Sequence, residues 1–138
     1  MKNRLILSLL VIFALIGCKT DDLSSKIDED TFWEKLQSAP FVVVPKEELP
    51  EWVNQIIEDL TISYVVNQPP GTFARIYRGK WDKRTVYYIT DSLSSCALCF
   101  WDEKAQRIQL NTQKDYDKFY ALSKNWELIF EVVNEPYQ

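Results

Sequence analysis

The strongest structural signal in the chain is the stretch TFARIYRGKWDKRTVYYITD, residues 72–91. Large apolar side chains alternate with other residues from position 73 to 81, and residues 85–90 are apolar on both faces. A period of two is typical of a β-strand, and an apolar run on both faces is typical of a strand inside a sheet. Residues 82–84 between them are polar and predict a turn. The stretch therefore predicts an antiparallel β-hairpin.

Further strands are predicted on both sides of this hairpin. Residues 99–110, CFWDEKAQRIQL, predict a second hairpin with its turn at residues 102–105. In WELIFEVV, residues 126–133, the predicted inward positions are Trp126, Leu128, Phe130 and Val132, and the predicted outward positions are Glu127 and Glu131. The run FVVV, residues 41–44, is bounded by prolines, which favours a sheet edge or an extended arm.

The clearest helix is predicted over residues 46–60, KEELPEWVNQIIEDL, because its apolar side chains form one stripe. A capping box at Thr31–Glu34 predicts a short helix to about Ser38, and residues 114–124 are a further candidate helix. The predicted fold class is α+β, an antiparallel sheet of about five strands with one main helix packed on one face. Residues 31–138 are expected to form this single domain.

The start of the chain has the three parts of a secretory leader. Lys2 and Arg4 give a basic start, residues 5–16 are apolar, and the small Gly17 precedes Cys18. A membrane-spanning helix needs roughly 20 apolar residues, so this run is too short to be one. The alternative is a buried N-terminal helix of the domain, but an all-apolar helix needs core on every side.

The sequence LIGC, which ends at Cys18, resembles the lipobox of bacterial lipoproteins. The resemblance implies that residues 1–17 are a signal peptide and that Cys18 becomes a lipidated N-terminus. The protein would then be held to a membrane through acyl chains, and two or more chains are needed for stable attachment. Residues 18–30 are mostly polar and predict a flexible tether between the lipid and the domain.

The residues after Cys18 bear on localisation. Lys19 followed by Asp21 and Asp22 is similar to the signal that exports Bacteroidetes-type lipoproteins to the cell exterior, although Thr20 interrupts it. With the lipobox, this likeness predicts a protein anchored in the bacterial envelope, at the outer membrane and with exposure at the surface. A merely solvated tether is the alternative.

Charge and composition exclude several functional classes. The net charge is −4, and without residues 1–17 it becomes −6, because they hold two of the 16 basic and none of the 20 acidic residues. An acidic chain argues against nucleic-acid binding and against a polybasic membrane patch. The chain has no histidine and only three glycines. The commonest general base, imidazole–zinc sites and glycine-rich phosphate loops are thereby excluded, and we expect no cofactor or metal.

Cys96 and Cys99 are the sharpest chemical candidates. On an extended strand their Cα atoms would lie about 10 Å apart, whereas a disulfide tolerates at most about 7 Å. A disulfide, expected in an exported protein, therefore requires residues 97–98 to turn. The alternatives are a catalytic pair, as in thioredoxin-like redox enzymes, and two free thiols. The first is disfavoured because the strand–helix context that lowers a thiol pKa is missing from the predicted pattern.

A second candidate is the aromatic row Phe73, Tyr77 and Trp81, with Arg75 on the same face of its strand. If this sheet face is bare, these residue types favour an interaction surface, since they often anchor interfaces. If another element covers it, the row is core. One strand with apolar groups on both faces leaves both interpretations open.

The middle of the chain, residues 46–110, resembles a group of small Bacteroidetes-type lipoproteins with a domain of unknown function. The likeness rests on LPEWVNQIIEDL, ARIYRGKW, TVYYITDSLSSCALC and WDEKAQRI. It implies an exported, lipid-anchored domain but no activity. A sheet crossed by a helix is also similar in architecture to periplasmic inhibitor and PepSY-like modules, and such a likeness does not give function.

The sequence thus predicts a lipid-anchored, non-catalytic binding module for an unidentified protein or surface ligand. The alternatives are a thiol-disulfide redox protein that uses Cys96 and Cys99 and a structural subunit of an envelope complex.

Overall fold

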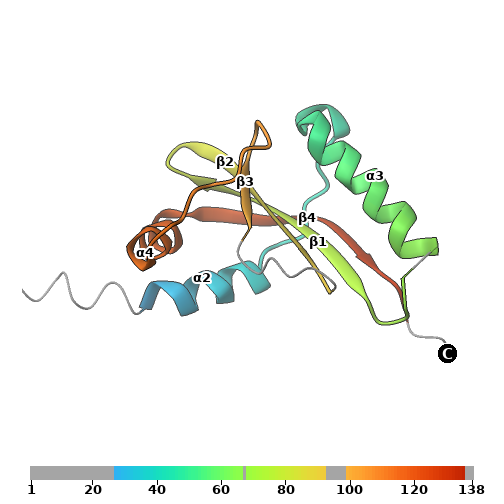
Figure 1. Cartoon of the computed structure of the whole chain (residues 1–138), viewed down its shortest axis with the longest axis horizontal. Helices are drawn as coiled ribbons and strands as arrows, with labels where there is room; N and C mark the ends of the chain where they lie inside the picture. Colours follow the sequence, from blue (N-terminus) through green and yellow to red (C-terminus); the bar gives the residue numbers. More distant parts are fainter. Residues whose placement is uncertain (1–26, 67, 93–98, 136–138) are drawn as a thin grey trace, which may run out of the picture.

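The computed structural model describes residues 27–66, 68–92 and 99–135, and these residues form one antiparallel sheet with helices on both faces. In chain order the elements are α2 (Ile27–Gln37), η1 (Lys46–Glu48), α3 (Glu51–Val66), β1 (Phe73–Trp81), β2 (Arg84–Asp91), β3 (Phe100–Asp102), α4 (Gln113–Leu122) and β4 (Lys124–Val133). The strand order is β3-β2-β1-β4 (Figure 1). The predicted α+β class is confirmed, with four strands in the described residues where about five were predicted.

The hairpin predicted from residues 72–91 is confirmed as β1 and β2. From Ala74 to Trp81, β1 pairs with β2 without a shift in register. Asp82 and Lys83 make the turn with φ values of 49° and 61°. Positive φ at both central residues lets a two-residue turn match the twist of its strands. Residues 85–88 of β2 are all buried, as predicted for an inner strand.

β4 departs from the alternation predicted for residues 126–133. Leu128 pairs with Tyr77 and Phe130 pairs with Ile76, so Ile129 is an extra residue opposite β1. Such a β-bulge changes which face the following side chains occupy. Leu128 accordingly packs against one core cluster and Phe130 against the other. The prediction of a single inward face along this strand is therefore wrong.

A second irregularity in the same ladder lies beside Gly79. The register between β1 and β4 shifts between Arg78 and Lys80, and Asn125 on β4 has a φ of 57°. The indole of Trp126 lies over Gly79 so closely that a Cβ atom there would be 2.6 Å from Trp126 Cδ2. Only glycine, which has no Cβ atom, leaves room for the indole at this position.

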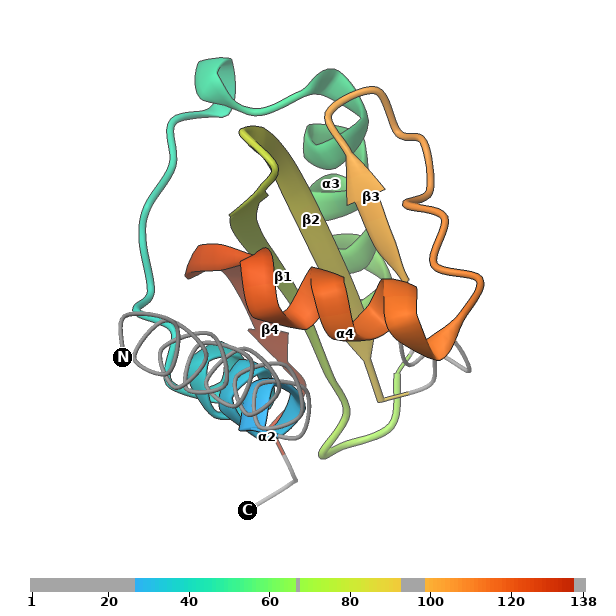
Figure 2. The same cartoon turned by 90° about the vertical axis from the view of Figure 1, so that its left-hand side faces the viewer.

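Helices α2 and α4 cover one face of the sheet, which we call the aromatic face (Figure 2). Most of the buried residues in this layer are aromatic. They are Phe32, Leu36, Tyr77, Val86, Tyr88, Phe100, Ile108, Phe119, Tyr120 and Trp126. Their rings meet in tilted and edge-to-face pairs, the arrangements that aromatic quadrupoles favour.

Helix α3 covers the opposite face, which we call the α3 face (Figure 1). Val53 packs here against Ile76, Tyr87 and Ile129 of the sheet. The predicted apolar stripe is confirmed, although the regular helix begins at Glu51 and continues beyond residue 60. The prediction of one main helix on one face did not place the two shorter predicted helices, which lie on the aromatic face as α2 and α4.

The ends of the other helices also differ from prediction. α2 begins at Ile27, so residues 27–30 are helical rather than part of the predicted tether. The capping box predicted at Thr31–Glu34 is therefore wrong, because both residues lie inside the helix. The candidate helix at residues 114–124 is confirmed as α4, which has a capping box of its own between Thr112 and Asp115.

Both edges of the sheet are bonded to a neighbouring loop. Beside β4, Leu128 donates a backbone hydrogen bond to Pro40 and accepts one from Val42, both 2.9 Å long. Beside β3, residues 106–108 bond to the strand backbone. Two of the predicted strands are therefore reduced to isolated bridges. They are residues 41–44 and the second half of the second predicted hairpin.

Candidate functional site

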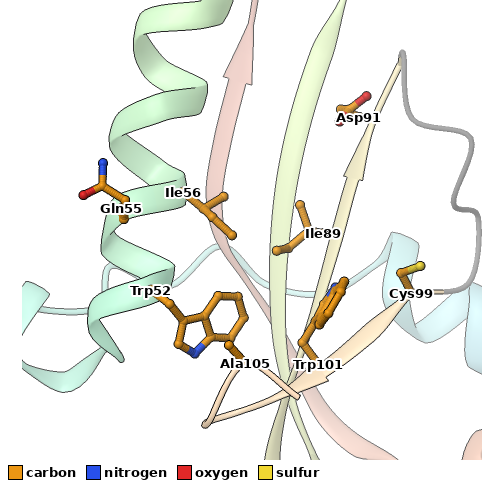
Figure 3. Close-up of a pocket in the computed structure, with 8 residues that line it drawn as sticks. All are labelled: Trp52, Gln55, Ile56, Ile89, Asp91, Cys99, Trp101 and Ala105. Carbon is orange, nitrogen blue, oxygen red and sulfur yellow. The ribbon is translucent and has the colours of Figure 1, made fainter. Parts of the chain in front are cut away.

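An apolar cleft opens between α3 and the β3 edge of the sheet (Figure 3). Its volume of about 530 Å³ lies within the range of small-molecule sites. α3 contributes Trp52, Gln55 and Ile56, and the sheet edge with its turn contributes Ile89, Asp91, Cys99, Trp101 and Ala105. We call it the tryptophan cleft.

Two tryptophans form opposite walls of this cleft. Trp52 lies in the first turn of α3, and its Nε1 donates a 3.0 Å hydrogen bond to the backbone oxygen of Glu103. Its ring also meets Tyr87 edge to face, with centroids 5.5 Å apart. Trp101 lies on β3, paired with Tyr87 in the ladder. In Figure 3, Trp52 points from α3 toward the sheet, Trp101 stands on the other side, and two isoleucines line the space between them.

The turn after β3 connects the two walls of the tryptophan cleft. Asp102 Oδ1 accepts backbone hydrogen bonds from Lys104 at 2.8 Å and from Gln106 at 2.9 Å. The same turn carries the Glu103 oxygen that holds Trp52 and the Ala105 side chain that lines the cleft. One hydrogen bond therefore joins the two sides of the cleft, and two more hold the turn that supplies its acceptor.

The polar groups of the cleft are few. The Gln55 amide donates to the Asp59 carboxylate at 3.1 Å, and Asp91 supplies a carboxylate at the far end. The described residues that line the cleft include no lysine, no arginine and no pairing of a nucleophile with a base. Burial raises the pKa of the neighbouring Tyr87, so its phenol stays neutral. This arrangement suits binding of an apolar group better than catalysis.

The structure places the predicted row of Phe73, Arg75, Tyr77 and Trp81 on one face, and the middle of that row is core. Tyr77 is only 8% exposed, and Trp81 packs partly buried against the same aromatic cluster. Burial also raises the pKa of Tyr77. Arg75 lies over the half-buried Phe73 ring, 4.5 Å from its centroid, and forms an ion pair with Glu131. An interaction surface formed by all four residues is therefore wrong, because Tyr77 and Trp81 pack in the cluster that α2 and α4 cover.

The predicted cysteine sites fall mostly outside the described residues. Cys18 and Cys96 both lie there, so lipidation and the pairing of Cys96 with Cys99 stay predictions. Cys99 itself is 7% exposed and borders the tryptophan cleft.

Two further properties concern metals and membranes. Within residues 27–66, 68–92 and 99–135, no group of three or more acidic, histidine or cysteine side chains is placed to hold a metal ion. Across that same part of the chain, no helix is both long enough and apolar enough to cross a membrane.

Comparisons with known proteins found no counterpart. No protein-family model matches the chain, and neither a curated protein nor a solved structure matches it. The resemblance to Bacteroidetes-type lipoproteins therefore stays a prediction from motifs, and the candidate site rests on its own geometry.

Sequence reasoning did not find the tryptophan cleft. It places Trp52 on the apolar stripe of a helix and Trp101 in a hairpin, and no local pattern connects positions so far apart. The sequence offers one signal, because Trp52 and Trp101 are large rings with a polar N–H at the border of a helix and of a strand. In the structure both rings are only half buried. That signal marks candidates but does not pair them, because the pairing depends on how α3 crosses the sheet.

Proposed function

We propose that the protein is a non-catalytic binding module, held at a bacterial membrane by acyl chains on Cys18, whose tryptophan cleft takes an apolar group of a protein or surface ligand. The observation that carries the binding role is the pair of tryptophans facing each other across a preformed apolar cleft. Aromatic side chains in concave sites contribute large contact areas at little cost in conformational entropy.

The chemistry of the cleft narrows the ligand group. Most of the lining is indole and aliphatic side chain, so a flat apolar or aromatic group gains the most from burial there. Asp91 is the charged residue of the lining, which disfavours an anionic group at that end and favours a hydrogen-bond donor. We therefore expect neutral aromatic ligands to bind and their anionic analogues to bind less well.

The test uses the neutral fluorescent probe N-phenyl-1-naphthylamine with residues 19–138, which contain every member of both core clusters. We expect saturable binding of one probe per chain and at least ten-fold weaker binding by Trp101→Ala. Val43→Ser is the matched control, because Val43 is 82% exposed and does not line the cleft. Equal binding by wild type, Trp101→Ala and Val43→Ser would contradict the proposal.

The anchor is tested separately. Mass spectrometry of protein extracted from cells is expected to find Cys18 at the N-terminus with acyl chains attached, and Cys18→Ser is expected to release the protein from membranes. An intact leader or an unmodified Cys18 would remove the anchor and leave the binding role in place.

One observation bears on the redox alternative, since Cys99 borders the same cleft. Its 7% exposure leaves little surface for an attacking thiolate, which is why we rank redox chemistry second. The test is reduction of insulin by dithiothreitol. Acceleration by the wild type that is lost in Cys99→Ser would favour the redox alternative over the binding role.

A further inference from the structure

The hairpin end of the sheet carries a second cleft with a different chemistry. It lies between the β1–β2 turn and the turn after β3, and its volume is about 500 Å³. Four cations line it, namely Lys80, Lys83, Arg84 and Lys104. We call it the basic cleft. The net charge of the chain is −4, so this concentration of cations is not a consequence of composition.

The carboxylates near these cations do not balance them. Asp102 and Glu103 also line the basic cleft, but the Asp102 carboxylate accepts the backbone hydrogen bonds of its own turn. The ion pairs formed among the described residues lie elsewhere, as Lys46–Glu58, Arg75–Glu131 and Arg78–Glu127. With four cations against two carboxylates, the lining keeps two positive charges in excess, and an anion that binds there reduces the repulsion among the cations.

Two of the cations are held in place by neighbouring side chains. Lys80 Nζ donates a 2.7 Å hydrogen bond to Thr85 Oγ1, and the Arg84 guanidinium lies over the Trp81 ring, 4.7 Å from its centroid. Arg107 lines an adjoining hollow together with Arg84. Cations that are already positioned lose less side-chain entropy when an anion binds.

We propose that the basic cleft is a binding site for a phosphate-type polyanion, distinct from the tryptophan cleft. A group with two or more negative charges and several oxygen acceptors matches the ammonium groups of the three lysines, while the Arg84 guanidinium, over Trp81 on the other face of the hairpin, adds positive charge nearby. The phosphate groups that bind belong either to a soluble phosphorylated molecule or to the lipid headgroups of a membrane. The net negative charge of the chain opposes both by long-range repulsion, so binding requires the local cluster.

The test uses residues 19–138 with inorganic pyrophosphate, followed by amide chemical shifts and calorimetry. We expect shifts centred on Lys80, Thr85 and Lys104 and at least ten-fold weaker binding by the double variant Lys83→Gln and Lys104→Gln. Both lysines are exposed and outside the core clusters, so the fold should persist, as circular dichroism will check. The matched control is Lys114→Gln with Lys118→Gln on α4, which removes the same charge elsewhere and should bind like the wild type.

A second arm distinguishes the sources of the phosphate. Vesicles containing phosphatidylglycerol are compared with pure phosphatidylcholine vesicles in flotation at low salt. Capture by the anionic vesicles that is lost in Lys83→Gln/Lys104→Gln points to a headgroup, and pyrophosphate binding without capture points to a soluble ligand. Failure in both arms, or equal weakening by the cleft and control variants, would overturn the proposal. These outcomes are independent of probe binding in the tryptophan cleft.

Discussion

The two faces of the sheet are filled in different ways. On the aromatic face, two helices and the sheet together bury a cluster of ten residues, seven of which are aromatic. On the α3 face, a single helix packs against the sheet, and the buried cluster has four residues with one aromatic ring. The tryptophan cleft lies on this second face, at the border where α3 leaves the sheet edge uncovered.

This difference separates stability from binding. Two helices and interlocking rings close the aromatic face, so a substitution there opens a cavity that the surroundings cannot refill. One helix cannot cover the whole width of a four-stranded sheet, and the uncovered margin of the α3 face remains available to a ligand. We therefore expect the largest losses of stability on the aromatic face and the largest losses of binding on the α3 face.

Phe119→Ala is expected to have the largest effect. Phe119 is fully buried, and its ring centroid is 4.4 Å from that of Phe100. Loss of the ring should lower the free energy of unfolding by about 3–5 kcal/mol, measured by urea denaturation. Val53→Ala, equally buried on the α3 face, should cost about 2 kcal/mol. A larger loss for Val53→Ala would break the comparison between the faces.

Gly79→Ala should have the next largest effect and lower the free energy of unfolding by about 1–3 kcal/mol through overpacking. The new methyl group would lie 2.6 Å from the Trp126 indole, which is buried in the aromatic face and has no room to withdraw. Thermal unfolding followed by circular dichroism measures this effect. Gly71→Ala is an unsuitable control because Gly71 has a φ of 84°, whereas Val43→Ala, at a position 82% exposed, leaves this contact unchanged. A wild-type melting temperature for Gly79→Ala would mean that Trp126 moves freely.

Thr112→Ala should cost about 1 kcal/mol, because Thr112 caps α4 and α4 closes the aromatic face. Its hydroxyl accepts a hydrogen bond from the Asp115 backbone amide at 3.2 Å. Urea denaturation of Thr112→Ser, which keeps the hydroxyl, should give nearly the wild-type midpoint. If both variants lose the same stability, the methyl group of Thr112 matters rather than the cap.

The smallest predicted effect is a dependence on pH. Hydrogen bonds from the Thr112 hydroxyl and then the Thr112 backbone amide hold the pKa of Asp115 below its usual value. The unfolded chain therefore takes up this proton first, and the stabilisation present above about pH 4 is lost as the pH falls through the folded pKa. The urea midpoint of Asp115→Asn should fall less than that of the wild type between about pH 6 and pH 3. An equal fall in the midpoints of the wild type and Asp115→Asn would contradict this prediction.

The elements with a clear period were predictable. The β1–β2 hairpin and the apolar stripe of α3 follow from spacing alone, because each pattern has one physical solution. The bulge at Ile129 was not predictable, since Ile129 and Val133 make the outward positions of WELIFEVV partly apolar and only pairing with β1 selects the extra residue. The burial of Tyr77 also depended on which helices cover β1, and this is a tertiary property.

The candidate sites were harder to predict than the fold. The tryptophan cleft joins residues 52 and 101, and the basic cleft joins two turns that are separated along the chain by β2 and β3. The net charge predicts an acidic protein without an anion-binding surface. The net charge is a sum over the whole chain, however, and does not show where the lysines and arginines lie. Four of them meet at one end because both turns emerge from the same end of the sheet.

The loops bonded along the sheet borders affect how other chains can approach. Backbone groups of Leu128 are already engaged by Pro40 and Val42, and those of Phe100 and Asp102 by residues 106–108. At these positions an incoming strand finds no free ladder to extend, so edge-to-edge aggregation and recognition by strand addition are both hindered. At these positions a partner is left with side chains to recognise, and the linings of the two clefts offer such side chains.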